Sequence, residues 1–216
     1  MLCINKKTDV LIVVDVQNDF LENGVLSIND SNQIISVINR LMTYFFDWSV
    51  ATQDWHPKDH KSFICNQTNR KKYDDFDFNY RSPMLWPRHA VQNTAGAEFP
   101  KELKQEYFKL IVRKGWRKDM DSYSAFYEND RKTSTGLLGW MHEINCKRIF
   151  FTGLAENYCV AYSAIDAVKA GFIMYIISDA TKPIENTLKN SHSEAISRQH
   201  LQDLGVIYIS SMDITL

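Results

Sequence analysis

Six short runs of apolar or β-branched residues recur along the chain, and most of them are continuous rather than alternating. Continuous runs of this length are typical of parallel strands that are buried on both faces. Patterns typical of helices separate several of the runs. Strands that alternate with helices predict an α/β fold, a three-layer doubly wound sheet of six parallel strands. The expected strands are 10–14, 49–53, 109–113, 148–152, 172–178 and 206–209.

The first expected helix follows the first strand. Asp30 or Ser31 is predicted to cap it, because short polar side chains accept bonds from the first N–H groups of a helix. Its apolar stripe consists of Ile34, Ile35, Ile38, Leu41, Met42 and Phe45. Further helices are expected at 135–144, 157–170 and 185–204. Gly171 and Gly205 follow the last two, and we expect them to adopt the left-handed conformation that commonly ends a helix.

The length of 216 residues fits one α/β domain. Size scaling indicates that about 70% of the surface of the extended chain is buried on folding, so a full core forms without disulfide or metal staples. No repeat or linker divides the sequence. We therefore expect a single domain over residues 1–216, with an irregular insert at about 64–85.

Charge and cysteine usage exclude several classes of protein. Lysine plus arginine number 25 and aspartate plus glutamate 26, so neither nucleic acid nor a membrane surface is an expected partner. The longest apolar stretch, 10–14, is far too short to span a bilayer, and the first ten residues carry no signal-peptide core. Four cysteines without a CxxC pair are typical of free thiols in a reducing compartment. We expect a cytoplasmic protein, with nuclear access left open.

Chemically active residues follow four of the expected strands. Open parallel sheets bind ligands at the carboxyl ends of their strands. We therefore expect an acid, a base and a thiol to meet on one rim. The residues placed there are Asp15, Asp54, Lys114 and Cys159.

Asp15 and Cys159 each have an ordinary structural alternative. Asp15 fits a general acid/base whose pKa is raised by a partly apolar pocket; the alternative is an Asp that caps a turn, a role that Asp19 fits better. Cys159 stands in the first turn of the third expected helix, where partial positive charge favours the thiolate and N–H groups stabilise an oxyanion. Its alternative is an inert thiol in an apolar stripe.

Lys114 ends the third expected strand, and Gly115 lets the chain turn sharply after it. A lysine at a strand end is commonly a solvated terminus. If its side chain projects into the rim, its ammonium lowers the pKa of the cysteine and balances the charge of Asp15. Arg113 alternates to the other face of the strand and is not expected in the same role.

The string DWHPKDH, followed by WPRHAV, contains Asp54, His56, His60 and His89. Oxygen and imidazole donors two residues apart leave an extended segment on the same side, so both reach one cation. The alternative is a surface aspartate with a capping histidine. A mixed Asp/His set with open positions suits Zn, Fe or Mn.

Three aromatic residues flank these positions in the sequence, Phe20, Trp86 and Tyr123. Aromatic residues in loops commonly cover a core. Alternatively, they sandwich a flat ring.

Five strings occur together in one order: VVDVQNDF, ATQDWHPKDHKSF, WPRHAVQNT, RKG with YSAF shortly after it, and GLAENYCV. This set resembles the motifs of the nicotinamidase family, within the isochorismatase-like cysteine hydrolases, and covers nearly the whole chain. The stretch 65–85 departs from the family pattern because it is longer and more charged. The stretch 115–126 resembles the family only at its ends.

The resemblance implies hydrolysis of nicotinamide to nicotinate and ammonia in NAD salvage, with pyrazinamide commonly accepted as well. It implies a catalytic triad of Asp15, Lys114 and Cys159. It implies an oxyanion hole formed by the backbone N–H groups of Ala155 and Cys159, with a cis peptide between Leu154 and Ala155. By the same resemblance, the metal ligands are Asp54, His56 and His89, and the ring-binding residues are Phe20, Trp86 and Tyr123.

The resemblance also implies one divalent metal ion, zinc first and iron or manganese as alternatives. Family members differ in whether the histidine at the position of His60 binds the metal directly or through water. Two other functions stay open at this point: a metal-independent amidohydrolase of the same superfamily that acts on another small amide, and a catalytically silent metal-binding protein. A homo-oligomer is also left open.

Overall fold

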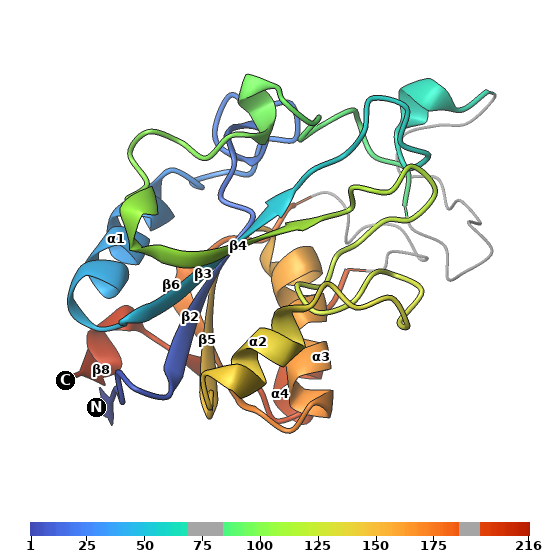
Figure 1. Cartoon of the computed structure of the whole chain (residues 1–216). Helices are drawn as coiled ribbons and strands as arrows, with labels where there is room; N and C mark the ends of the chain where they lie inside the picture. Colours follow the sequence, from blue (N-terminus) through green and yellow to red (C-terminus); the bar gives the residue numbers. More distant parts are fainter. Residues whose placement is uncertain (69–83, 186–194) are drawn as a thin grey trace.

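A six-stranded parallel sheet forms the centre of the computed structural model, which describes residues 1–68, 84–185 and 195–216 (Figure 1). Every neighbouring pair of its strands is parallel, which confirms the predicted fold class. The order across the sheet is β4-β3-β2-β5-β6-β7. The strands are β2 (Asp9–Val14), β3 (Trp48–Asp54), β4 (Phe108–Lys114), β5 (Arg148–Gly153), β6 (Ile173–Thr181) and β7 (Ile207–Ile209).

The chain runs outward from the middle of the sheet in two opposite directions. From β2 the chain proceeds outward to β3 and β4, and from β5 it proceeds the other way to β6 and β7. Connections that leave in opposite directions open a crevice at the carboxyl ends of the two central strands. Asp15 directly follows β2, and Leu154 directly follows β5, so this crevice is where the predicted site falls.

Burial differs between the centre and the edge of the sheet. All six residues of β2 are buried, as a continuous apolar run predicts. The edge strand β4 instead alternates, with Lys109, Ile111 and Arg113 exposed. The expectation of burial on both faces is therefore wrong for β4, because one face of this edge strand is left in contact with water.

Helices cover both faces of the sheet. Figure 1 shows α1 (Gln33–Tyr44) on one side, and α2 (Leu137–Glu143), α3 (Ala161–Lys169) and α4 (Arg198–Asp203) on the other. The buried residues of α1 are five of the six predicted ones, Ile34, Ile35, Ile38, Leu41 and Met42, while Phe45 lies just after the helix and is half-buried.

The predicted cap of α1 is wrong. The helix begins after Asn32, and no side chain caps it. Asp30 adopts a positive φ of 57°, and its carboxylate accepts a hydrogen bond from the Gln33 side chain instead of a helix N–H. Ser31 is buried, and its hydroxyl has no hydrogen-bond partner among the described residues.

Two other helix predictions need correction. The segment predicted as a helix at 157–170 consists of a π-helical turn, Glu156–Val160, followed by α3. Of the segment 185–204, residues 186–194 lie outside the described residues, and α4 begins only at Arg198. Gly171 and Gly205 have φ values of +89° and +91°, which confirms the predicted helix ends.

A second, two-stranded parallel sheet was not predicted. It pairs β1 (Leu2–Cys3) with β8 (Ile214–Thr215) and brings the two chain ends side by side (Figure 1). Two residues a strand are too short to produce a recognisable pattern. In the described residues, no helix has the length and apolar character needed to cross a bilayer. The short 3-10 turns are Asn18–Phe20, Ile64–Asn66, Ala95–Ala97, Gln105–Tyr107 and Ser211–Asp213.

The predicted insert at 64–85 is described only at its ends, since residues 69–83 lie outside the described residues. Around it, isolated bridges pair His56 with Val91 and Phe63 with Trp86. These bridges draw the segment after β3 and the segment before Val91 together, and both carry predicted metal ligands. The single-domain assignment stays a prediction.

Candidate active site

The ammonium of Lys114 lies at the centre of the crevice and is fully buried. Its Nζ lies 2.8 Å from Oδ2 of Asp15, 2.5 Å from Oδ1 of Asp54 and 3.3 Å from Sγ of Cys159. It also donates to the carbonyl of Ser122 at 2.9 Å. The four rim residues expected from the strand order therefore meet, with Asp15, Asp54 and Cys159 around the ammonium of Lys114. The reading of Lys114 as a solvated strand end is wrong.

Asp15 is positioned by its backbone and by β3. The residue adopts a positive φ of 48°, and the hydroxyl of Thr52 donates to its Oδ1 at 2.6 Å. Burial, with a smaller contribution from the charge of Asp54, raises the pKa of Asp15 to about 6 against the opposing effect of Lys114. At neutral pH this carboxylate is thus ionised, with a proton affinity suited to a base.

Asp19, the alternative capping residue, has a different role. Its carboxylate accepts the backbone N–H of Ala90, next to His89, at 2.8 Å. The carboxylate also lies where a Cβ on Gly96 would lie. Asp19 thus connects the loop after β2 with the segment that carries His89.

Cys159 lies in the π-helical turn that precedes α3, with its side chain buried against the pocket. Burial raises the pKa of Cys159 well above its ordinary value, although Lys114 lowers it. The expectation that a helix N-terminus favours the thiolate is therefore wrong for the resting site, because desolvation of the sulfur outweighs the nearby positive charge. The thiolate forms here only when a base accepts the proton.

The peptide between Leu154 and Ala155 is cis, as the resemblance implies. Ala155 lines the pocket, and its backbone N–H has no acceptor among the described residues. The neighbouring N–H of Glu156 donates to the carbonyl of Lys182 at 2.9 Å and is therefore not available to a ligand. Ala155 is the better-placed donor for an oxyanion.

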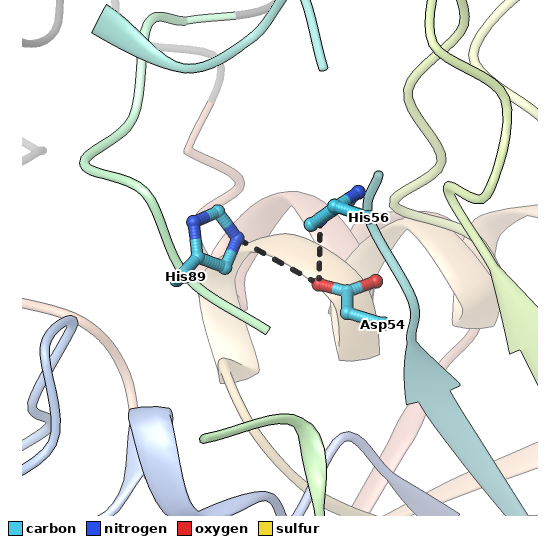
Figure 2. Close-up of side chains that lie close together, drawn as sticks. All are labelled: Asp54, His56 and His89. Carbon is cyan, nitrogen blue, oxygen red and sulfur yellow. Dashed lines mark ion pairs between the residues drawn. The ribbon is translucent and has the colours of Figure 1, made fainter. Parts of the chain in front are cut away.

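Asp54, His56 and His89 form a group whose ligand atoms lie within 4.8 Å of one another. Figure 2 shows both imidazole rings facing the same oxygen of the Asp54 carboxylate, with Nε2 of His56 3.6 Å and Nε2 of His89 4.0 Å from its Oδ2. Nδ1 of His56 lies 2.8 Å from the carbonyl of Gly115, and Nδ1 of His89 2.7 Å from that of Pro87. Each Nδ1–H donates there, which leaves the Nε2 atom of both rings facing the carboxylate.

This donor set fits a divalent metal ion. Two histidines and one carboxylate are a common arrangement for ions that keep open positions, and hydrogen bonds from Nδ1 to carbonyls fix the rings. Burial lowers the pKa of His89 to about 4, so its imidazole is neutral, as a ligand requires. Another group of possible ligands, Asp15, Asp54 and Cys159, also lies close together. The cation among these three side chains is the ammonium of Lys114, which contacts each of them.

His60 is arranged differently from the other two histidines. Its Nδ1 lies 2.6 Å from the hydroxyl of Ser62, and its Nε2 3.1 Å from the carbonyl of Met120. With His56 and Asp121 it forms a second buried group whose ligand atoms lie within 4.8 Å of one another. The role of His60 toward a metal stays a prediction.

A pocket lined by Cys159 and by Asp54, His56 and His89 joins the two groups of residues. The three predicted aromatic residues all line it, and Nε1 of Trp86 donates to the hydroxyl of Tyr123 at 3.1 Å. The reading of these residues as a cover over the core alone is therefore wrong. Further walls that the sequence did not indicate are Leu26, Ile28, Asp121, Leu154, Tyr158 and Ile184.

Several supporting residues were missed from the sequence. Thr52 and Ser122 act on Asp15 and Lys114, and the carbonyl of Gly115 holds His56. A strand threonine and a loop serine are too common to be singled out. Gly115, in contrast, stood next to Lys114 in the motif, and its φ of +62° confirms the predicted sharp turn.

Known proteins with the same features were found by sequence and by structure. The Isochorismatase domain family matches residues 9–207. The nicotinamidase of Acinetobacter baylyi is 44% identical over 204 residues, which cover 94% of this chain and 93% of that protein.

Two solved structures extend the comparison. The nicotinamidase/pyrazinamidase of Acinetobacter baumanii superposes with a TM-score of 0.89 at 42% identity, covering 96% of this chain and 98% of the other. The pyrazinamidase of Pyrococcus horikoshii, solved in complex with zinc, superposes with a TM-score of 0.71 at 30% identity, covering 94% of this chain and all of the other. With its six-stranded sheet and a matched region that spans most of its length, the chain belongs to the Isochorismatase family.

Proposed function

We propose that this protein is a nicotinamidase, which hydrolyses nicotinamide to nicotinate and ammonia through a thioester on Cys159. One observation carries the proposal: a buried lysine contacts both an aspartate and a cysteine, and this cysteine lines the same pocket as an Asp/His/His group. The names of the similar proteins support the same substrate.

The first half of the reaction forms the acyl-enzyme. Ionised Asp15 accepts the proton of the Cys159 thiol, and the ammonium of Lys114 stabilises the thiolate. The sulfur forms a bond to the carboxamide carbon, and the electron pair of the C=O bond moves to oxygen, where the N–H of Ala155 donates to it. The C–N bond then breaks, and Asp15 returns its proton to the nitrogen, which leaves as ammonia.

The second half releases nicotinate. Asp15, ionised again, accepts a proton from water while the water oxygen forms a bond to the thioester carbon. The C–S bond breaks, the sulfur takes back a proton, and nicotinic acid loses its own proton to the medium. Lys114 stays a cation throughout, because the charges of Asp15 and Asp54 raise its pKa well above the ordinary value against the opposing effect of burial.

We propose zinc as the ion, held by Asp54, His56 and His89, with support from the donor set and from the zinc complex of the similar pyrazinamidase. When bound, a divalent ion supplies a Lewis acid that takes the pyridine nitrogen of the substrate and orients the ring. The chain itself contributes the flat walls: Phe20 and Trp86 lie against the same pocket as His89. Pyrazinamide, also a flat ring with a carboxamide, is proposed as a second substrate.

The test is ammonia release from nicotinamide by the purified protein, before and after chelation and with added Zn, Fe or Mn. We expect turnover that chelation abolishes and one of the ions restores. Turnover that persists after complete removal of metal would instead support a metal-independent amidohydrolase. Absence of ammonia release with every ion would support a catalytically silent metal-binding protein.

A further inference from the structure

An ion pair between Glu156 and Arg198 lies outside the pocket lining. Glu156 is the first residue of the π-helical turn Glu156–Val160, which we call the nucleophile turn. Nε and Nη2 of Arg198 contact Oε1 and Oε2 of Glu156 at 2.5 and 2.7 Å. The side chain of Glu156 is only 4% exposed, whereas that of Arg198 is 55% exposed. The hydroxyl of Tyr208 also donates to Oε1 at 3.3 Å. This pair connects the nucleophile turn to α4 and β7.

Other bonds tie the start of the nucleophile turn to the same C-terminal segments. The backbone N–H of Glu156 donates to the carbonyl of Lys182 at 2.9 Å. The side-chain amide of Asn157 donates to the carbonyl of Ile184 at 3.1 Å and accepts its N–H at 3.0 Å. The carbonyl of Asn157 accepts the N–H of Ile196 at 2.9 Å. These bonds therefore fix the first two residues of the nucleophile turn, while Cys159, near its other end, lines the pocket.

A buried ion pair of this kind fixes the positions of its two side chains more than it stabilises the fold. Desolvation offsets much of the attraction in a buried ion pair, so its net contribution to folding is commonly small. A bidentate guanidinium–carboxylate pair, in contrast, has one favourable arrangement and fixes both partners. Catalysis by Cys159 needs such fixation, because displacing a reacting group by about 1 Å costs on the order of 100-fold in rate.

We propose that Glu156 and Arg198 are positioning residues that hold the nucleophile turn so that the sulfur of Cys159 stays beside Lys114 and Ala155 stays in the pocket wall. The inference rests on the proposed hydrolysis of nicotinamide. Neither Glu156 nor Arg198 lines the pocket, so the pair acts on the rate of attack and leaves substrate binding unchanged.

The test compares Glu156→Gln and Arg198→Lys with the parent enzyme. Each variant keeps the length of the side chain closely but loses the bidentate charge pair. We expect kcat to fall about 10-fold and the dissociation constant for nicotinate to change less than about twofold. Because the two residues act as one unit, the double variant should lose little more than either single variant. The rate at which iodoacetamide alkylates Cys159 should fall with kcat.

The pair of Asp9 and Arg148 provides a matched control. Arg148 also contacts both oxygens of a buried carboxylate, but at the start of β2 and β5, the opposite end of the strands. Asp9→Asn and Arg148→Lys should change the free energy of unfolding to a similar degree and leave kcat and the alkylation rate unchanged. Tyr208→Phe removes only one bond to Glu156 and should lower kcat about twofold to threefold.

The inference is overturned if folded Glu156→Gln and Arg198→Lys retain the kcat and alkylation rate of the parent, or if the Asp9 and Arg148 variants lose both equally. If neither Glu156→Gln nor Arg198→Lys folds, an unchanged kcat in Tyr208→Phe overturns it. A parent enzyme that releases no ammonia refutes the proposed function instead. In that case slower alkylation in the variants still supports the role of the pair.

Discussion

Replacing Gly115 by alanine tests whether the turn after β4 positions His56. Gly115 has a φ of +62°, and an added Cβ would lie 2.5 Å from Cε1 and 2.8 Å from Nδ1 of His56. The carbonyl of Gly115 also accepts the hydrogen bond from Nδ1. The same bond that orients the ring therefore holds it against the position of the new methyl group.

The size of the effect follows from these distances. Carbon atoms pack at about 3.5 Å or more, so the ring must move by about 1 Å. Loss of the partner that orients a ligating histidine costs about 10–100-fold in metal affinity, which corresponds to about 1.4–2.7 kcal/mol. The left-handed backbone conformation costs the alanine a further 1–2 kcal/mol, roughly, in the free energy of folding.

The assay is competition for zinc with a chromogenic chelator, together with urea unfolding. Gly171→Ala is the control, because Gly171 also has a positive φ, +89°, but a Cβ there meets nothing within 4 Å. Both variants should lose a similar amount of stability from backbone strain. Only Gly115→Ala should lose metal affinity.

Equal zinc affinity in the parent, Gly115→Ala and Gly171→Ala would refute the reasoning. It would mean that His56 does not bind the ion or that its ring moves without cost. A parallel loss in both variants would point to strain alone.

Three further predictions concern Cys159, Lys114 and Glu128. Cys159→Ala should release no ammonia and still bind nicotinamide in calorimetry; turnover near the parent value would exclude the thioester. Lys114→Met should cost about 3–5 kcal/mol in urea unfolding, because two buried carboxylates lose their shared cation, and a stability equal to that of the parent would contradict the burial argument. Burial raises the pKa of Glu128 from 4.5 to about 7, so the folded state binds more protons than the unfolded state across this window and stability falls as pH rises through it. Glu128→Gln should flatten that slope in unfolding measured from pH 4.5 to 8, and an unchanged slope would assign it to other groups.

The local sequence pattern was sufficient to predict the strands of the central sheet and the residues at their carboxyl ends. Each strand of the central sheet carries its own apolar run, so its position is encoded by neighbouring residues. Parallel strands all end at one edge, and this rule alone predicts that Asp15, Asp54, Lys114 and Cys159 lie close together. The caps and lengths of the helices were predicted less well, because a few backbone bonds decide them. Asp30, for example, does not cap the helix because it adopts a left-handed backbone conformation.

The state of the site depended on packing between distant segments. The sequence places Cys159 near a helix start, which favours a thiolate, yet burial of the sulfur outweighs that effect and keeps the proton on it. Likewise, nothing near Glu156 in the chain indicates that Arg198, 42 residues later, forms a pair with it. Desolvation and pairing are sums over everything that surrounds a group in space. For this reason the residue types at the site were readable from the sequence, whereas their protonation and their supports were decided by the tertiary structure.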